Sequence, residues 1–280
     1  MILSLAAALA AAVGYGVSTI MQAVATRSTH GLAAVTTPLV VAALLVDGLA
    51  WLLSLVALDR LPLFLVQAVL AGSVVVVVLL ARWFLGARLR RVDVGAVVAV
   101  VLALVVIGAA GGEQPATAPP AGFVVVLVTG SVLLALATVL LYRSGSSRAL
   151  SVAAGLGYSV AALGARTAHA ADDLLGTVLQ PVAVAVVLGG VVGAVAYLRA
   201  LEQGRVGGTA ATVSVLEVVV PGGIGVAVLG DVVRDGWAVP AVLALAVALA
   251  ACVVLATSPA NSAAEGQDVA RPGDGAPASV

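Results

Sequence analysis

The part of the sequence that decides the fold is residues 57–108, which read ALDRLPLFLVQAVLAGSVVVVVLLARWFLGARLRRVDVGAVVAVVLALVVIG. Two long apolar runs lie on either side of a short link that carries Arg88, Arg90 and Arg91. A helix needs about 20 consecutive apolar residues to cross the hydrocarbon core of a bilayer. Each run is long enough, so this stretch predicts two membrane-spanning helices joined by a polar turn.

The rest of the chain repeats this pattern of long apolar runs and short polar links. Nine segments are long and apolar enough, or nearly so, to cross a membrane. They are residues 2–24, 33–58, 61–85, 92–110, 121–142, 149–167, 179–200, 206–230 and 237–257. The predicted fold is therefore all-α: a polytopic membrane helix bundle of about nine transmembrane helices.

The composition excludes several classes of protein. The chain is 62% hydrophobic and 9% charged, whereas a soluble domain is roughly a quarter charged. Thirteen arginines are balanced by thirteen acids, so no net basic charge is left for a nucleic acid. The sequence contains neither an H-E-x-x-H nor a G-x-S-x-G motif. We therefore expect neither an enzyme nor a nucleic-acid binder, and no cofactor.

The arginines are distributed unevenly between alternate links. With nine spans, ten of the thirteen fall on the side of the C-terminal tail and three on the other side. Arginine-rich links stay in the cytoplasm, which places the N-terminus outside and the tail inside a cytoplasmic membrane. Residues 258–280 are polar and rich in Pro, Gly and Ala, which predicts a disordered cytoplasmic tail.

The two halves of the chain share short motifs at a nearly constant spacing. Gly14-Tyr15 precedes Gly157-Tyr158 by 143 residues, and Leu85-Gly86 precedes Leu229-Gly230 by 144. This spacing relates four helices in residues 1–111 to the last four of five helices in residues 121–257. An offset of five helices reverses the second copy in the membrane, so we expect two inverted repeats. Inverted repeats are typical of secondary transporters, which bind substrate near the midplane.

Two acidic residues fall inside predicted spans, Asp47 in 33–58 and Glu217 in 206–230. Charged residues inside a membrane are costly, face the bundle interior and mark ion or substrate pathways. Both are therefore candidates for binding a substrate or a coupling ion. The alternative is a neutral carboxyl group that only forms a hydrogen bond with a neighbouring helix.

Other residues are candidates for the same site. Pro221, Gly222 and Gly223 follow Glu217 by one turn and predict a helix break beside it, or else a kink that serves packing. Further candidates for contact with substrate are Tyr15, Tyr158, Gln67, Ser73 and Thr212. Arg166, with Asp172 and Asp173, is expected in a solvated link.

Residues 57–108 also resemble the drug/metabolite transporter superfamily. The resemblance lies in an Ala-Leu that ends one helix, a Leu-Pro that opens the next and a Leu-Gly-x-Arg exit at residues 85–88. The second copy is similar in its Pro221 and in the acid Asp231 after Leu229-Gly230. The opening AAVGYGVSTIMQAVATRS, with Gln22, looks like the first helix of the NIPA-type magnesium transporters. Most members have two EamA-type halves of five helices, one more helix than is counted here.

The resemblance implies a secondary transporter that moves a small solute by alternating access, coupled to protons or cations and most simply an exporter. One alternative is a Mg²⁺ or divalent-cation transporter of the NIPA type, with Asp47 and Glu217 as metal ligands. A second alternative is a membrane scaffold that transports nothing. The expected partners are a small molecule or cation and membrane lipid, and the sequence leaves open whether the chain forms a homodimer.

Overall fold

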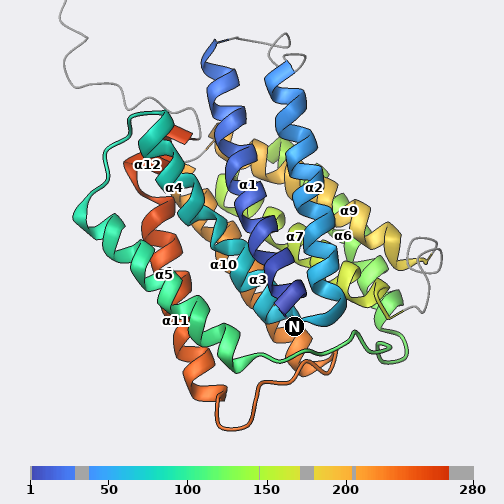
Figure 1. Ribbon diagram of the computed structural model, residues 1–280. Coiled ribbons are helices and arrows are strands. Elements are labelled where there is room, and N and C mark those ends of the chain that lie inside the picture. Colours follow the sequence, from blue (N-terminus) through green and yellow to red (C-terminus); the bar gives the residue numbers. More distant parts are fainter. Residues whose placement is uncertain (1, 29–37, 145, 171–179, 204–205, 265–280) are drawn as a thin grey trace, which may run out of the picture.

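The computed structural model describes residues 2–28, 38–144, 146–170, 180–203 and 206–264. Every regular element in these ranges is a helix (Figure 1). The long helices are α1 (Ile2–Ser28), α2 (Pro38–Arg60), α5 (Arg91–Ala110), α6 (Phe123–Ser144), α7 (Ser147–Ala168), α9 (Val182–Gln203), α10 (Val206–Ala227) and α11 (Ala238–Ala256). The shorter ones are α3 (Leu63–Ala71), α4 (Ser73–Phe84) and α12 (Pro259–Ala264).

Nine helical segments of the described chain are long and apolar enough to cross a membrane, with α3 and α4 together forming one of them, Leu63–Phe84. The all-α polytopic bundle predicted from the sequence is confirmed. The N-terminal end of α1 and helix α12 lie at opposite ends of the bundle, as an odd number of crossings requires (Figure 1). We call the end that carries α12 the tail end and the opposite end the far end.

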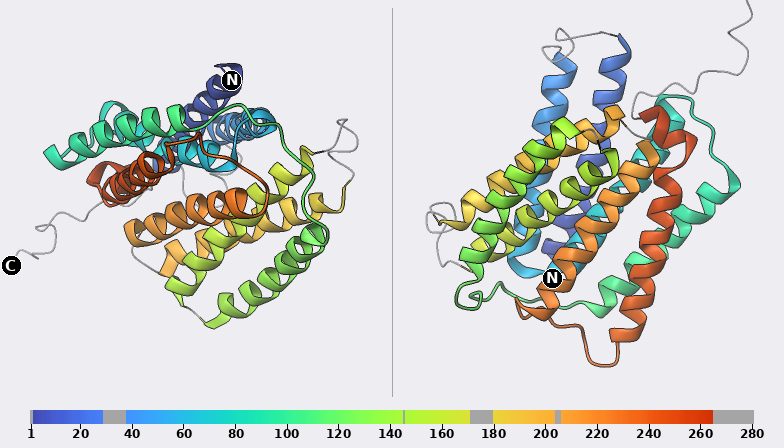
Figure 2. Two further views of the ribbon diagram at one scale, coloured as in Figure 1. Left: turned by 90° about the horizontal axis from the view of Figure 1, so that it is seen from below. Right: turned by 180° about the vertical axis from the view of Figure 1, so that it is seen from behind.

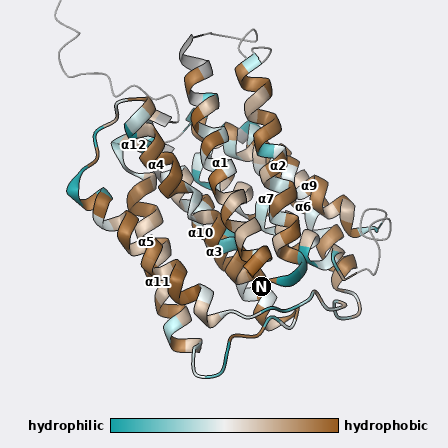
Figure 3. Cartoon of the chain, in the orientation of Figure 1, coloured by the Kyte–Doolittle hydropathy of each residue, from teal (hydrophilic) through white to brown (hydrophobic). Residues whose placement is uncertain are grey.

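Apolar side chains cover the long helices on the outside as well as between them. On α2, Leu45 and Leu49 are more than half exposed, and on α6 so are Val126 and Leu140. Hydrophilic residues gather in the links and at helix ends, while the helix sides are mostly hydrophobic (Figure 3). A water-soluble protein would not expose so much contiguous apolar surface. The outer surface therefore suits contact with lipid tails.

The helices pack in two groups that meet along the middle of the molecule (Figure 2). In one group α1 packs on α2 and α4, and α5 packs on α11. In the other group α7 packs on α9 and α10, and α6 packs on the outside of α9 and α7. The contact between α3 and α10 joins the groups. Small residues make the closest approaches, since a Cβ on Gly157 would lie 2.6 Å from the backbone nitrogen of Gly193.

The helix interruption is not where the sequence predicted it. Helix α10 runs without a break through Pro221, Gly222 and Gly223, so the break predicted there is wrong. The span 61–85 was expected to be one helix, but it divides at Gly72 into α3 and α4. A Cβ on Gly72 would lie 3.0 Å from the Leu104 side chain of α5, so the close approach of α5 favours glycine there.

The ends of the predicted domains also differ in detail. The tail predicted to be disordered from residue 258 begins with helix α12, which packs against α4. Ser258 Oγ accepts a hydrogen bond from the Asn261 backbone N–H at 3.1 Å, and both residues are buried. Residues 265–280 lie outside the described residues, so the prediction for them stays a prediction.

The polar links carry their own local order. At the start of α5 the Asp93 carboxylate accepts the Arg90 backbone N–H at 2.8 Å and pairs with the Arg90 guanidinium. The hydrogen bond from the Arg90 guanidinium to the Asp93 carboxylate raises the pKa of Arg90 above its ordinary value. An acid in the first turn also favours the positive end of the helix dipole. The link between α4 and α5 is therefore held on the α5 side by a defined cap.

Candidate functional site

A cavity of about 530 Å³ lies in the tail half of the bundle, between helices from both groups. Its walls come from the last turns of α1 and α9, the start of α4, the first half of α10, the helix α7 and the short helix α12. The lining residues are Thr19, Gln22, Ser73, Val74, Val77, Tyr158, Tyr197, Leu198, Leu201, Ala210, Val213, Ser214, Glu217 and Asn261. Three of the predicted candidates, Ser73, Tyr158 and Glu217, are among them.

Among the described residues that line this cavity, Glu217 is the single acidic or basic side chain. It is partly exposed because its side chain faces the cavity. Proline has no backbone N–H, so Pro221 cannot donate to the Glu217 carbonyl one turn before it. Glu217 thus combines a carboxyl group that faces the cavity with a main-chain carbonyl that lacks its usual helical donor.

Two tyrosines add aromatic rings to the cavity wall. The Tyr158 ring fits into space left by Gly193 of α9, where a Cβ would come within 2.7 Å of the ring. Tyr197 lies one turn later on α9 and also lines the cavity. Tyr158 lies within electrostatic range of the carboxyl groups of both Glu217 and Asp47. The aromatic part of the site therefore lies beside its acidic part.

Asp47 does not line the cavity, but it lies near Ser18, which a hydrogen bond joins to Gln22 of the cavity wall. Gln22 Nε2 donates to Ser18 Oγ at 2.9 Å, and Ser18 Oγ donates to the Ala43 carbonyl at 2.9 Å. The Ser18 hydroxyl also interacts with the Asp47 carboxyl group. Tyr15, one turn away on α1, lies within electrostatic range of Asp47 and Glu217. Tyr15 and Tyr158 thus each lie within electrostatic range of both carboxyl groups, Asp47 and Glu217.

The remaining predicted residues are not part of the cavity wall. Gln67 is buried in α3. The Thr212 hydroxyl donates to the Gly208 carbonyl of its own helix at 2.9 Å. Gly222 serves packing, since a Cβ there would lie 3.2 Å from Phe64 of α3. Pro221 and Gly223 are also absent from the lining residues.

The far end of the bundle is closed by a buried ion pair between α7 and the link after α10. Arg166 Nη2 donates to Asp231 Oδ1 at 3.0 Å, and both side chains are almost completely buried. The expectation of a solvated Arg166 is wrong, because α7 continues to Ala168 and carries Arg166 into the protein. Asp172 and Asp173 lie outside the described residues.

The same ion pair connects three further segments. Asp231 Oδ2 accepts the Leu63 backbone N–H at 2.6 Å, at the start of α3. Arg166 Nη1 donates to the Leu58 carbonyl at 2.6 Å, near the end of α2, and Nη2 donates to the Gln114 carbonyl at 3.1 Å. Each of these backbone groups is a helix-end or loop group that needs a partner. We call Arg166, Asp231 and these contacts the far-end clamp.

Sequence reasoning missed Arg166 and Asp231 as partners because 65 residues separate them. The signal that was present is the sequence Leu229-Gly230-Asp231. Gly230 has a φ of 77°, which turns the chain after α10. Gly225 leaves room for the Asp231 carboxyl group, because a Cβ on Gly225 would lie 2.7 Å from Asp231 Oδ2. Asn261 was missed because it fell in the segment predicted to be disordered.

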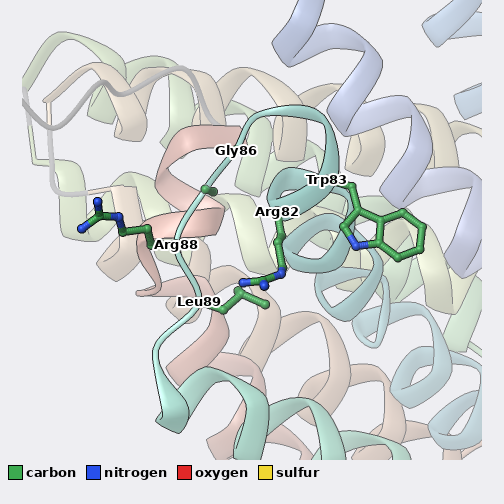
Figure 4. A pocket seen from close by; sticks show the side chains of 6 residues that line it. Arg82, Trp83, Gly86, Arg88 and Leu89 are labelled. Atoms are coloured by element: carbon green, nitrogen blue, oxygen red, sulfur yellow. The ribbon is translucent and has the colours of Figure 1, made fainter.

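A second, shallower hollow of about 600 Å³ lies at the tail end around the link between α4 and α5. Figure 4 shows Arg82 pointing toward Leu89, Arg88 pointing to the other side of the link and Trp83 pointing away from it. Trp83 is 81% exposed. A tryptophan and arginines at the end of a span are typical of the membrane–water interface. The hollow therefore belongs to the surface and not to the central site.

The described residues contain no group of three or more His, Cys, Asp or Glu side chains that could hold a metal ion. Comparison of the chain with protein-family models, curated proteins and solved structures finds no match. The cavity and the far-end clamp are therefore the features of this chain that bear on its function.

Proposed function

We propose that this protein is a secondary transporter of the drug/metabolite type, which moves a small solute across the cytoplasmic membrane by alternating access. The observation that carries the proposal is a cavity that reaches an intramembrane carboxyl group from the tail end, while buried polar contacts close the far end. A site near the midplane with one closed side is the arrangement expected of one state of such a cycle.

The contacts between helices support an internal repeat. Gly14 of α1 meets Ala50 of α2, where a Cβ on Gly14 would lie 2.9 Å from the Ala50 Cβ. Gly157 of α7 meets Gly193 of α9 in the same manner. Both members of the second pair lie 143 residues after those of the first. The pair α1–α2 thus corresponds to α7–α9 in sequence and in packing.

The ends of α4 and α10 support the same correspondence. Gly86 and Gly230, 144 residues apart, both have positive φ angles, 66° and 77°. The Ala87 N–H donates to the Ala81 carbonyl at 3.2 Å, and the Asp231 N–H donates to the Gly225 carbonyl at 3.0 Å. These are matching helix-terminating turns, each with a glycine of positive φ and a backbone hydrogen bond to the carbonyl six residues earlier. On this correspondence α3 and α4 match α10, α5 matches α11, and α6 has no counterpart.

Two repeats of opposite orientation give a chain two similar shapes, one open to each side. Ala87 stands where Asp231 stands in the second copy, so the described residues of the tail end have no equivalent of the far-end clamp. We therefore propose that the clamp holds the state open to the tail end, and that the far end opens when Arg166 and Asp231 separate. The excess of arginine in the tail-end links favours the cytoplasm for that side.

The magnesium alternative has weaker support. Mg²⁺ prefers six oxygen ligands in near-octahedral geometry and is usually held by carboxylates together with retained water. Glu217 is the one carboxylate among the lining residues, and Asp47 lies behind Ser18 on another helix. About half of the lining residues are aliphatic. The wall is better suited to a solute with apolar surface.

Alternating access is tested by labelling single cysteines from each side of sealed, oriented vesicles with a membrane-impermeant maleimide. The native Cys252 is first replaced by alanine, and Ser214→Cys places the reporter in the cavity wall. We expect labelling from the tail side, and from the far side as well once Asp231→Asn weakens the clamp. Glu202→Cys, exposed near the tail end of α9, is the control that should react from one side only. Labelling of Ser214→Cys from the tail side alone, with and without Asp231→Asn, would contradict the proposal.

A further inference from the structure

The charge and shape of the central cavity define a substrate class more narrowly than the fold does, and this step rests on the proposed function. We propose that the cavity binds a monovalent, amphipathic organic cation, with the charged head at Glu217 beside Tyr158 and the apolar body along α4 and α10. The cavity, the lone carboxyl group and the aromatic rings are separate observations that point to the same ligand.

The first observation is the sign of the charge. Among the described residues none that lines the cavity is basic, and neither Glu217 nor Asp47 has an ion-pair partner there. Arg166 of α7 pairs with Asp231, and Arg199 of α9 pairs with Glu202 and lies over the Tyr142 ring. A carboxylate without a cationic partner in a low-dielectric site favours a positively charged ligand and disfavours an anion.

The second observation is the chemistry around that carboxyl group. Tyr158 and Tyr197 offer aromatic faces, which attract organic ammonium groups through their electron-rich surface. The Ser73 and Ser214 hydroxyl groups lie in the same wall. Val74, Val77 and Val213 provide aliphatic surface for the rest of the molecule. A hydrated metal ion makes no use of such aliphatic surface, whereas an amphipathic cation does.

The third observation is size. A volume of about 530 Å³ falls in the range of small-molecule sites, roughly 300–1,000 Å³. One carboxyl group in the wall balances one positive charge. The cavity therefore suits a cation with a single charge and a body about as large as an aromatic ring with alkyl substituents.

The test is equilibrium binding to the purified full chain in detergent, measured by titration calorimetry with four probes. These are the cation benzyltrimethylammonium, the neutral benzyl alcohol, the anion phenylacetate and Mg²⁺. We expect binding of benzyltrimethylammonium alone, and a loss of roughly tenfold to a hundredfold in affinity for Glu217→Gln, the range for removing a charged partner. Glu202→Gln is the matched control, since Glu202 is exposed outside the cavity, and it should bind as the wild type does.

A second set of variants distinguishes contact from misfolding. Glu217→Asp keeps the charge and should retain more affinity than Glu217→Gln, and Tyr158→Leu should weaken the cation by several-fold. Preferred binding of the neutral probe, the anion or Mg²⁺, or equal binding of the cation by Glu217→Gln, would overturn the substrate class. If in that case Ser214→Cys combined with Asp231→Asn still reacts from both sides, the transporter proposal survives. If that combined variant reacts from the tail side only, both proposals fail.

Discussion

At the scale of single residues, the clamp and the cavity show two different uses of buried charge. Arg166 and Asp231 are fully paired, and each also satisfies backbone groups at helix ends. Glu217 has no ion-pair partner among the described residues and lines the cavity. A buried ion pair holds structure in place, whereas an unpaired carboxyl group in a cavity is available to a ligand.

The clamp should therefore respond to mutation as a structural pair. Asp231→Ala leaves Arg166 buried without its counter-ion and leaves the Leu63 N–H without its acceptor. We expect a loss of about 3–5 kcal/mol of stability, the range for breaking a buried pair. The melting temperature of the detergent-solubilised protein should fall accordingly. The double variant Arg166→Met with Asp231→Leu should recover part of the loss, and a further large fall would show that the separate backbone contacts matter more than the pair.

Glu217 should respond as a functional residue. Glu217→Gln keeps the size of the side chain, so we expect normal insertion and an unchanged melting temperature. Transport of the solute into proteoliposomes should be abolished. The neutral amide cannot release a proton and bind a cation in its place, as the carboxyl group is proposed to do. Asp47 does not line the cavity, so Asp47→Asn should reduce the rate of transport without abolishing it. Full transport by Glu217→Gln would remove this residue from the mechanism.

At the scale of helices, the sequence was most informative where the signal is local. Span length and hydropathy depend on neighbouring residues, so all nine spans were predicted, and Glu217, Tyr158 and Ser73 were named as candidate site residues within them. The division at Gly72 was not predicted, and the close approach of Leu104 to that glycine comes from another helix. The break at Pro221 was wrong because one missing N–H does not end a helix that is packed on both sides. The clamp was missed because it joins distant segments.

The pairing of α7 with α9 gives a helix-scale prediction. Gly157→Ala places a methyl group 2.6 Å from the Gly193 nitrogen, so the two backbones must move apart. Overpacking of this kind costs about 1–3 kcal/mol, and we expect a lower melting temperature and a lower yield of folded protein. Gly190→Ala, on α9 but with no atom within 4 Å of the added methyl group, is the matched control and should be neutral. Equal effects of the two substitutions would show that helix propensity decides the outcome.

At the scale of the whole molecule, the cavity in the tail half and the clamp at the far end would represent one conformation of the proposed two-state cycle. The proposed repeat predicts a second conformation in which the roles of the ends are exchanged. The α3–α10 contact, between helices that correspond to one another in the proposed repeat, lies where the two groups meet. Motion between states should therefore occur as a rotation of one group against the other.

Spin labels provide a measurement of this motion. Opening of the far end is measured with a pair of labels at Asp59 and Asp235, which are both exposed there. Opening of the tail end is measured with a second pair at Arg88 and Glu202. We expect two populations, with the far-end distance increasing when the tail-end distance decreases. Asp231→Asn should shift the populations toward the far-open state. A single unchanged distribution at both ends, in lipid and with a bound cation, would indicate a rigid molecule.

Helix α12 has a practical consequence for handling the protein. It packs against α4 and places Asn261 in the cavity wall, so the chain leaves the described structure beside the cavity. A fluorescent domain joined directly after Ala264 would lie next to that opening and compete for space with whatever enters. The same domain joined ahead of α1 would lie at the opposite end of the bundle (Figure 1). Reporter fusions and immobilisation for binding studies are therefore better attached ahead of α1.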